Sequence, residues 1–345
     1  MRKRWKVFLF VLLVMTIAAL ALGRWAWNEL VGPSTRFEEK SRVLFVHTGA
    51  DYRTVLDSLI ALEAITDEQG FTWLCERKNY TTNVKPGRYR IPRGMSMNAM
   101  VNMLRAGEQE PVKLTFSNVD HLPELAGRVA RALEPDSVAF LMAFMDAGLQ
   151  KEVGLDEETL ISLFVPNTYE FWWTTTPEQF IARMRKEHDA FWNADRVAKA
   201  RKRGLSQEQV ATLASIVQAE TMRMSDAPKI AGVYLNRLRI GMPLQADPTL
   251  KFALGLDSVN RVLAKDKDVD SPYNTYRNRG LPPGPINMPE PRFIDAVLNA
   301  EKHDFLYFCA KDDLRGYSDF TRSYEQHLVN ARRYQRALNQ RKIFR

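Results

Sequence analysis

The feature that most constrains this chain is an apolar run near its N-terminus, from Val7 to Gly23, in which Thr16 is the only polar side chain. A run of this length spans the hydrocarbon core of a bilayer as a short helix. Basic residues precede it at positions 2–6, and Trp25 and Trp27 follow it. Basic flanks stay cytoplasmic and tryptophans prefer the membrane interface. The pattern therefore predicts a single-pass anchor of the cell inner membrane, with a cytoplasmic N-terminus and everything after about residue 30 in the periplasm.

A cleaved signal peptide is the alternative, because Ala19-Leu20-Ala21 fits the small-x-small cleavage pattern. The run is longer than most signal cores, and bulky tryptophans crowd its downstream side, so we favour a retained anchor. Both interpretations export everything after about residue 30.

The net charge of +8 comes from the two ends of the chain. Positions 2–6 carry four basic residues, and positions 332–345 carry six with no acidic residue; 39 basic and 41 acidic residues remain. A near-neutral folded part does not predict nucleic-acid binding. The basic C-terminal segment is either a solvated helix end, which we favour, or a contact with anionic envelope lipid or polymer.

The cysteines and histidines of the sequence give no indication of a metal or cofactor site. Cys75 and Cys309 are far apart and form no CxxC pair, so a disulfide and two unpaired buried thiols both remain open, and we favour the thiols. The five histidines lack metal-ligand spacing, and GxGxxG, P-loop and GxSxG motifs are absent. We expect no metal and no cofactor.

The chain divides into five predicted parts: a cytoplasmic basic tail (1–6), a transmembrane anchor (7–27), a linker (28–41), a small β/α module (42–110) and a larger domain (111–340). The module should contain a strand at 42–47, a helix from Asp51 to about Ala64, a turn and strand from 85, and a helix capped by Ser96 and ended by Gly107. The larger domain should contain a strand at 111–117, helices at 122–133, 136–148, 177–192, 206–224, 226–240, 291–302 and 321–340, and a core strand at 305–310 paired with 317–321. Without regular βαβ alternation, the fold class is α+β.

Glu220 is the most informative single residue. Ser206 and Gln209 form a potential capping box for its helix, and at 100° per residue the apolar Leu213, Ile216 and Val217 lie within about 60° of Glu220, with Gln218 on the opposite, polar side. A carboxyl group on a buried face has a raised pKa, as a general acid needs. The alternative, which periodicity alone favours, is a last turn that leaves the core and pairs Glu220 with a basic side chain.

Two further segments carry candidate binding residues. Asn236 lies in an apolar helix, and Gln245 and Asp247 follow it; such hydrogen-bonding side chains suit sugar hydroxyls, although Asp247 is equally a helix N-cap before Pro248. The loop 271–291 contains six prolines and carries Tyr273, Asn274 and Tyr276. It suits either a cleft wall or a structural connection whose tyrosines pack inward.

Several motifs in one order resemble the YceG-like family of endolytic murein transglycosylases. They are ASIVQAET at 214–221, YLNRL at 234–238, LQADPT at 244–249, YNTY at 273–276 and GLPPGPI at 280–286, with FVPNTY at 164–169 similar to the family's F-x-P-[DE]-T-Y element. The resemblance runs from about 42 to 338 and implies that 42–110 is a LysM-like module and 111–340 a YceG-like catalytic domain. Gln218, Asn167 and Ser318 stand where the family usually has Glu, an acid and His.

The resemblance implies that Glu220 is the catalytic acid, in a cleft lined by Asn236, Gln245, Asp247, Tyr273, Asn274 and Tyr276. The implied reaction cleaves the MurNAc-β-1,4-GlcNAc bond without water, because the C6 hydroxyl closes on C1 to leave a 1,6-anhydroMurNAc end. The tethered nucleophile lets one carboxyl group act twice. Implied partners are peptidoglycan glycan strands, nascent ones whose length the cut limits, and peptidoglycan synthases. A noncatalytic peptidoglycan-binding scaffold and a hydrolytic muramidase remain the alternatives.

The anchor makes a prediction that reporter fusions test. A reporter that is active only outside the cytoplasm should be active when fused after residue 345, because the basic flank holds the N-terminus inside. The full-length chain should sediment with membranes, because the apolar helix is retained. A cytoplasmic signal from that fusion would overturn the topology. A shortened, soluble mature chain would instead establish the signal peptide.

Overall fold

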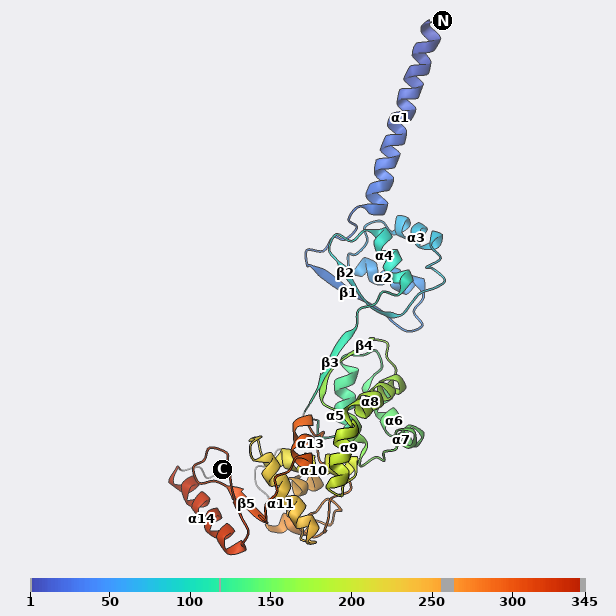
Figure 1. The fold of residues 1–345 in the computed structure, drawn as a ribbon. Helices are drawn as coiled ribbons and strands as arrows, with labels where there is room; N and C mark the ends of the chain where they lie inside the picture. The colour runs from blue at the N-terminus through green and yellow to red at the C-terminus, as the bar shows by residue number, and fades with distance from the viewer. Residues whose placement is uncertain (1, 118, 256–263, 342–345) are drawn as a thin grey trace. The chain divides into compact units, whose positions relative to one another are not determined.

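The computed structural model describes residues 2–117, 119–255 and 264–341, and the chain forms two compact units (Figure 1). Unit 1 comprises Met1–Lys113 with two returning segments, Ala132–Pro135 and Glu170–Thr175. Unit 2 comprises Leu114–Arg131, Asp136–Tyr169 and Thr176–Arg345. The division after Lys113 lies close to the predicted boundary at 110, and the sequence pattern did not indicate the returning segments.

Helix α1, Arg2–Val31, contains the apolar run. Its stretch Trp5–Arg24 is long and apolar enough to cross a membrane, and none of it is buried within the protein. A signal sequence near an N-terminus has the same length and composition. The helix therefore agrees with single-pass anchoring, and its orientation and the membrane that holds it stay predictions.

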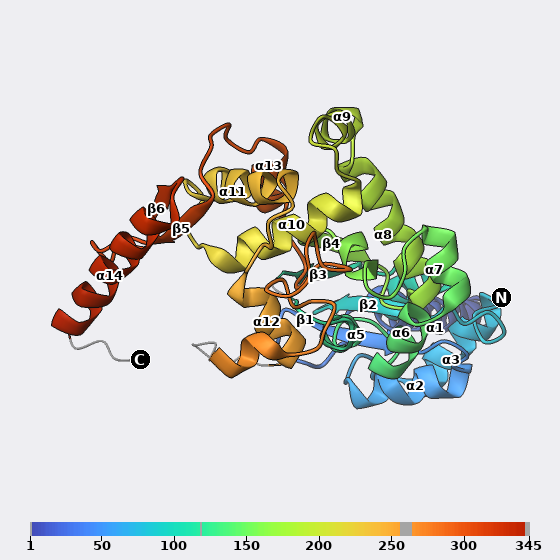
Figure 2. The ribbon, with the colours of Figure 1, turned by 90° about the horizontal axis from the view of Figure 1, so that it is seen from below.

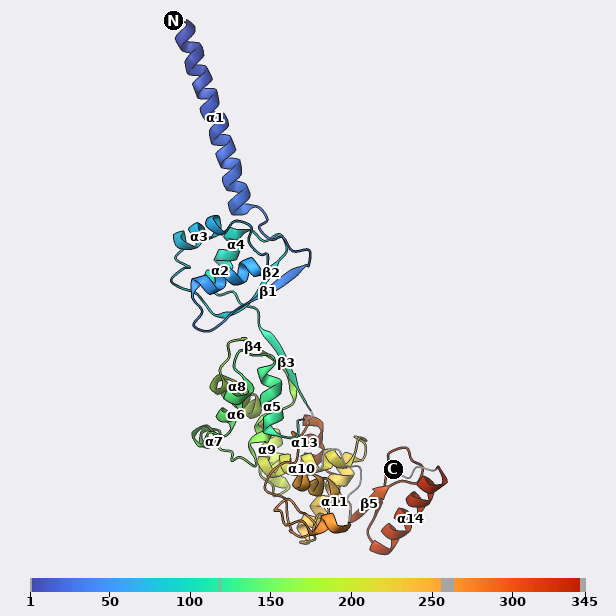
Figure 3. The ribbon, with the colours of Figure 1, turned by 180° about the vertical axis from the view of Figure 1, so that it is seen from behind.

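Unit 1 packs three helices against a two-stranded sheet (Figure 3). Strand β1, Ser41–Val46, pairs antiparallel with β2, Gly87–Pro92, so that Ser41 faces Pro92 and Val46 faces Gly87. The helices are α2, Tyr52–Ala61, α3, Glu68–Arg77, and α4, Met97–Ala106. Both strands, α2 and α4 were predicted. Helix α3 was not, because Gly70 and sparse apolar residues obscure its period.

The helix ends of unit 1 follow from local hydrogen bonds. The side chain of Asp51 accepts from the backbone of Thr54, and that of Ser96 from Ala99. Gly107 ends α4 in the left-handed conformation, with φ of 75°. Helix α2 ends at Ala61, before the predicted Ala64, because Glu63 adopts a φ of 51° and turns the chain. The signals for capping in the sequence were therefore reliable, and the end of α2 was misplaced by one turn.

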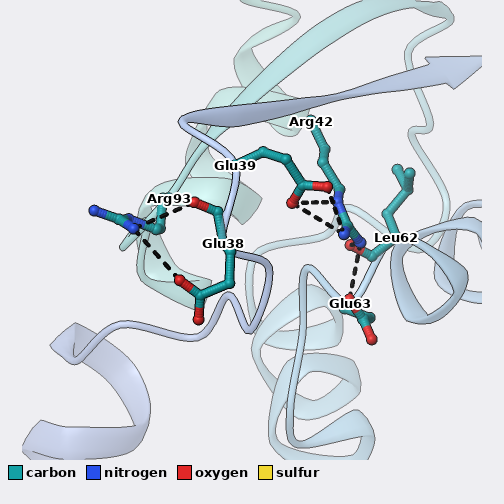
Figure 4. Close-up of polar contacts among 6 residues, drawn as sticks. All are labelled: Glu38, Glu39, Arg42, Leu62, Glu63 and Arg93. Carbon is teal, nitrogen blue, oxygen red and sulfur yellow. Dashed lines mark hydrogen bonds and ion pairs between the residues drawn. The ribbon is translucent and has the colours of Figure 1, made fainter.

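Arg42 ties the start of β1 to the end of α2 (Figure 4). Its guanidinium donates to Glu39, at 3.0 Å from Nη2 to Oε2, to Glu63 at 2.9 Å and to the carbonyl of Leu62 at 3.0 Å. Each exposed ion pair contributes only about 0.2–1 kcal/mol to the free energy of folding. Their main effect here is therefore to hold the chain in position where it enters β1.

The first part of unit 2 is helical around a phenylalanine cluster. Its elements are α5, Leu122–Ala130, α6, Ser137–Phe144, α7, Ala147–Val153, the 3-10 helix η1, Leu160–Leu163, and α8, Pro177–Phe191. The predicted helix at 136–148 is two helices, because Asp146 is the N-cap of a second one. Its side chain accepts a hydrogen bond from the backbone N–H of Leu149. Strands β3, Val112–Phe116, and β4, Asn167–Phe171, form a second two-stranded sheet.

The second part of unit 2 is built around α10, Gln207–Glu220 (Figure 2). Helices α9, Ala194–Lys202, α11, Ala227–Arg239, α12, Asp247–Leu254, and α13, Pro291–Leu298, pack against it, and every residue from Val210 to Val217 is buried. A further 3-10 helix, η2, spans Ala264–Asp268. Helix α10 ends at Glu220 rather than at 224, since Thr221 is extended, with φ of −149°. Helix α9 was not predicted.

A strand pair and a long helix complete unit 2. Strand β5, Tyr307–Ala310, pairs antiparallel with β6, Ser318–Thr321, and α14, Tyr324–Gln340, packs on both (Figure 2). The predicted pairing is confirmed, but β5 is half-buried and not a core strand. Arg332, Arg333, Arg336 and Arg341 are exposed, and positions 342–345 of the predicted basic segment lie outside the described residues.

The two cysteines are unpaired. Cys75 is buried in the core of unit 1, and Cys309 is half-buried on β5. The favoured interpretation of two free thiols is confirmed, except that only one of them is fully buried.

Gly284 provides a test of the packing of the proline-rich loop. A Cβ atom at this position would meet the backbone carbonyl of Glu158, which cannot rotate away. Gly284→Ala should lower the free energy of unfolding by about 1–3 kcal/mol, the usual effect of overpacking. Gly127→Ala, in α5 with nothing within 4 Å, should leave it unchanged or raise it. Thermal unfolding of both variants checks this, and equal melting temperatures would contradict the close approach.

Candidate active site

Glu220 is the last residue of α10 and lines two cavities. The helix begins with the predicted capping box: Ser206 accepts from the backbone of Gln209 at 3.1 Å, and the Gln209 side chain accepts from the backbone of Ser206 at 3.0 Å. The two cavities have volumes of about 870 Å³ and about 280 Å³. Phe308 also lines both, so Glu220 and Phe308 mark their junction.

The predicted amphipathic stripe describes α10 only in part. Leu213, Ile216 and Val217 are fully buried as expected, but every other residue from Val210 to Val217 is buried as well, so the buried part is wider than a stripe. Gln218 is only partly exposed. Its side chain accepts from the backbone of Glu290 at 2.8 Å and donates to the carbonyl of Met288 at 3.4 Å. Gln218 therefore holds the end of the proline-rich loop from a side of the helix that is only partly open to solvent.

The carboxyl group of Glu220 is held by Tyr234 of α11, whose hydroxyl donates to Oε1 at 2.7 Å. Burial raises the pKa of Glu220 to about 7, and the hydrogen bond from Tyr234 opposes that rise. The charge of Asp247 raises the pKa further, whereas Arg237 and Lys251 lower it. The alternative in which Glu220 leaves the core to pair with a basic residue is not what the structure shows.

Three of the six predicted binding residues line the smaller cavity beside Glu220: Gln245, Asp247 and Tyr276. The hydroxyl of Tyr276 donates to Oδ1 of Asp247 at 2.5 Å. This bond joins the proline-rich loop to the start of α12. Gln245 has a φ of 50°, a backbone conformation that is uncommon for residues other than glycine. Its N–H donates to the carbonyl of Thr275 at 3.0 Å.

Asp247 is not the N-cap of α12, as one interpretation of the sequence had it. The cap position is Ala246, and no side chain caps the helix. The N–H of Ala246 donates instead to the hydroxyl of Thr275 at 3.0 Å, and that hydroxyl lies 2.9 Å from the hydroxyl of Thr249. The neighbouring loop thus satisfies the helix start, which leaves the carboxylate of Asp247 directed to the cavity.

Asn236, Asn274 and Tyr273 do not line the cavities that Glu220 lines, which corrects their predicted role. Asn236 donates to the carbonyls of His303 at 2.7 Å and Phe305 at 3.1 Å. Two residues along a helix are about 200° apart, so Asn236 turns away from the face on which Tyr234 meets Glu220. Asn274 is fully buried. Tyr273 packs on Phe252 at 4.7 Å and lines a separate cavity.

Several cavity residues had no role in the sequence-based prediction. Tyr234 and Arg237 come from α11, and Tyr307, Phe308, Tyr324 and His327 come from β5 and α14. Arg237 is buried and donates to the carbonyl of Leu244 at 2.5 Å and of Leu306 at 2.7 Å. The pairs Tyr234/Arg237 and Tyr324/His327 are each three apart, a spacing that places both members on one helix face. That spacing is the feature of the sequence that could have indicated these cavity residues.

The larger cavity opens on the other side of Glu220. It is lined by 221–223, by β5 from Phe308 to Ala310, and by 314–318. The guanidinium of Arg223 lies 5.0 Å from the ring centroid of Tyr317 and donates to the carbonyl of Arg315 at 2.6 Å. The carboxylate of Asp226 accepts from the backbone of Ser318 at 2.7 Å, which attaches the β5–β6 turn to the start of α11.

The arrangement supports proton transfer. A single carboxyl group with a pKa of about 7 lies where two cavities meet, and at neutral pH it exists in both protonation states. Such a group donates and accepts protons equally well. Across the described residues 2–117, 119–255 and 264–341, no group of three or more His, Cys, Asp or Glu side chains is arranged to hold a metal ion.

Comparison with known proteins gives consistent results. The model of the YceG-like family matches residues 44–333. The endolytic murein transglycosylase of Bacillus subtilis (strain 168) is 27% identical over 335 residues, covering 91% of this chain and 90% of that protein. That of Streptococcus pneumoniae serotype 2 is 29% identical, covering 74% of this chain and 52% of that protein. The crystal structure of a yceG-like protein from Listeria monocytogenes, 29% identical, superposes with a TM-score of 0.57 over 84% of this chain and 98% of that one.

The raised pKa of Glu220 predicts a pH-dependent effect on stability. In the unfolded chain the group ionises near 4.5, whereas in the folded protein it holds its proton to about pH 7. Glu220 therefore costs stability progressively as pH rises from 4.5 to 7, and the loss is complete above that range. Glu220→Gln should gain about 1–3 kcal/mol over the wild type at pH 8 relative to pH 4.

Denaturant unfolding at the two pH values measures the difference. Tyr234→Phe provides a second arm, because removing a donor to the ionised carboxylate should raise the pKa of Glu220 and deepen the pH dependence. The same stability change at pH 4 and pH 8 for Glu220→Gln would show that Glu220 is not desolvated.

Proposed function

The chain belongs to the YceG-like family and is an endolytic murein transglycosylase, and on this premise we propose that Glu220 is its catalytic residue. The observation that carries the proposal is the position of one carboxyl group, with a pKa of about 7, where two cavities meet. Among the described residues, no other acidic side chain lines both cavities.

The two cavities suit an enzyme that cuts inside a glycan strand. An internal cut requires sugar units on both sides of the scissile bond, so the acid must lie between two binding regions. Glu220 has the cavity of about 870 Å³ on one side and that of about 280 Å³ on the other. We assign the larger to one arm of the strand and the smaller, with Gln245, Asp247 and Tyr276, to the other.

The proposed reaction uses Glu220 twice. Its protonated carboxyl group first donates to the glycosidic oxygen as the bond from C1 of MurNAc breaks and GlcNAc leaves with a free 4-hydroxyl. The C6 hydroxyl of the same MurNAc then bonds to C1, and the carboxylate of Glu220 accepts the hydroxyl proton. The product is a 1,6-anhydroMurNAc end, and the acid is regenerated. Because the nucleophile is tethered to the electrophile, proximity supplies much of the activation.

Tyr234 is the positioning residue of this scheme. Its hydroxyl fixes one carboxyl oxygen of Glu220 at 2.7 Å. That leaves the other oxygen to meet the substrate. The bond also stabilises the carboxylate formed after the first proton transfer, which keeps the pKa from rising above the neutral range.

A hydrolytic muramidase is the competing function, and Asp247 is the observation that favours it. This second carboxylate lines the smaller cavity close enough to Glu220 to influence its pKa. A hydrolase needs such a group to activate water or attack C1. Asp247, however, accepts a hydrogen bond from Tyr276 at 2.5 Å, which occupies one of its carboxylate oxygens and supports a binding role.

We further propose that α1 holds the enzyme at the inner membrane with both units in the periplasm, where new glycan strands are made. Cleavage of nascent strands there limits their length, and peptidoglycan synthases are the expected neighbours. Within unit 1, the segment 42–110 is proposed as a LysM-like module.

Glu220→Gln tests the assignment, because it keeps shape and hydrogen bonding but removes the titratable proton. Release of anhydro-ended muropeptides from purified peptidoglycan should fall by roughly 10²-fold or more, the usual contribution of a positioned proton-transfer group. Glu208→Gln, in the first turn of the same helix, is the matched control and should keep wild-type rates.

Mass spectrometry of the products separates the alternatives. Anhydro ends from the wild type support the transglycosylase, and reducing ends would establish the hydrolase. Absence of cleavage would favour the noncatalytic peptidoglycan-binding scaffold. Folded Glu220→Gln protein that still releases anhydro ends at the wild-type rate would remove Glu220 from the mechanism.

A further inference from the structure

The smaller cavity has a second wall that the mechanism does not use. It is formed by three rings, Tyr307 from β5 and Tyr324 and His327 from α14, which we call the aromatic wall. The rings of Tyr307 and His327 stack with centroids 5.5 Å apart and planes 27° apart. Tyr324 lies 6.2 Å from His327 and 5.6 Å from Tyr307. The three rings therefore contact one another.

The wall contains an unsatisfied polar atom. Nδ1 of His327 is buried and has no hydrogen-bond partner in the part of the chain that the structure describes. Leaving such an atom unpaired costs about 1–3 kcal/mol, which a ligand that supplies the partner recovers on binding. Burial, with a smaller effect of Arg237, lowers the pKa of the imidazole below its ordinary value. The ring is therefore neutral at pH 7 and carries one N–H donor.

The wall also presents an open apolar surface. The side chain of Tyr324 is 55% exposed although it belongs to a large aromatic residue lining a cavity. Tyr307 is held in place by Arg237, because the guanidinium of Arg237 lies 5.4 Å from the ring centroid and is itself fixed by two backbone carbonyls. An exposed ring beside a fixed one forms a surface on which the apolar face of a sugar ring stacks.

The pairing of one donor with apolar rings points to a particular substituent. A hydroxyl group can accept from an N–H group but brings no apolar part to pack on the rings. An acetamido group brings a carbonyl oxygen that accepts a hydrogen bond, an N–H group that donates one, and a methyl group that packs on aromatic carbon. Gln245 and Asp247, in the lining of the same cavity, offer acceptors for the N–H group, and the aromatic rings match the methyl group.

We propose that Tyr307, Tyr324 and His327 form a subsite for an N-acetylated sugar on the smaller-cavity side of Glu220, in which the imidazole N–H group of His327 donates to the acetamido carbonyl. The inference rests on the proposed glycan-cleaving function and deepens it by naming the residues that select the 2-acetamido group. His327 is a specificity-determining residue and takes no part in proton transfer.

Binding of two matched tetrasaccharides tests the subsite. Chitotetraose and cellotetraose have the same ring and linkage, and only the first carries acetamido groups. Calorimetric titration is made with the full-length protein in detergent, in a Glu220→Gln background so that no turnover occurs. The unmodified wall should bind chitotetraose more tightly than cellotetraose.

Substitutions at His327 and Tyr324 separate the hydrogen bond from stacking. His327→Phe keeps a ring but removes the donor, so its dissociation constant for chitotetraose should rise roughly tenfold, with cellotetraose unchanged. His327→Asn places an amide donor near the position of Nδ1 and should retain most of the preference. Tyr324→Ala should weaken the binding of both sugars. Leu328→Ala, on the same helix but not in the cavity lining, should leave the binding of both unchanged.

The outcomes are decisive in each direction. If His327→Phe binds chitotetraose as tightly as the parent does, or if it weakens both sugars equally, or if the parent shows no preference between them, the acetamido subsite is wrong. Because the titrations compare the binding of two sugars and not their cleavage, they do not depend on the identity of the catalytic residue. Failure of the mechanism would appear separately, as undiminished anhydro-end release by Glu220→Gln.

Discussion

The burial of α10 from Val210 to Val217 is the constraint on which the site depends. A helix segment without a solvent face must satisfy its few polar side chains within the protein. Ser215 does so by accepting from the backbone of Ile286 at 3.0 Å, and its carbonyl accepts from Asn287 at 3.1 Å. Together with Gln218, it fixes the proline-rich loop to the helix. The core helix is thereby also the frame that holds the walls around Glu220.

The end of that helix is a distinctive electrostatic position. Burial removes water from the carboxyl group of Glu220, and a helix C-terminus carries partial negative charge, so both factors disfavour ionisation. The phenol of Tyr234 offsets part of this effect by donating to the charged form. The pKa of about 7 is thus a balance, with neutral and ionised forms both accessible, as a group that must first donate and then accept a proton requires.

The loop 271–291 shows that two interpretations of one segment can both hold. Asn274 is fully buried and donates to the carbonyls of Lys267 and Val269, at 2.9 Å and 2.7 Å, while accepting from the backbone of Tyr276. These bonds are structural. The same turn directs the hydroxyl of Tyr276 onto Asp247 in the cavity. The buried hydrogen bonds of Asn274 thus hold the turn that places the polar side chain of Tyr276 in the site.

The sequence by itself determined the features that depend on neighbours along the chain. These are the apolar helix near the N-terminus, the caps at Asp51, Ser96 and Ser206, the mixed α and β elements, the helix that ends near Glu220, and the order of motifs that marked the family. Only the tertiary structure decided which side chains face Glu220. It selected Gln245, Asp247 and Tyr276, turned Asn236 away, and brought Tyr324 and His327 from a helix about a hundred residues later. The reason is physical: periodicity gives the angle of a side chain about its own helix axis, but what lies at that angle depends on how distant elements pack.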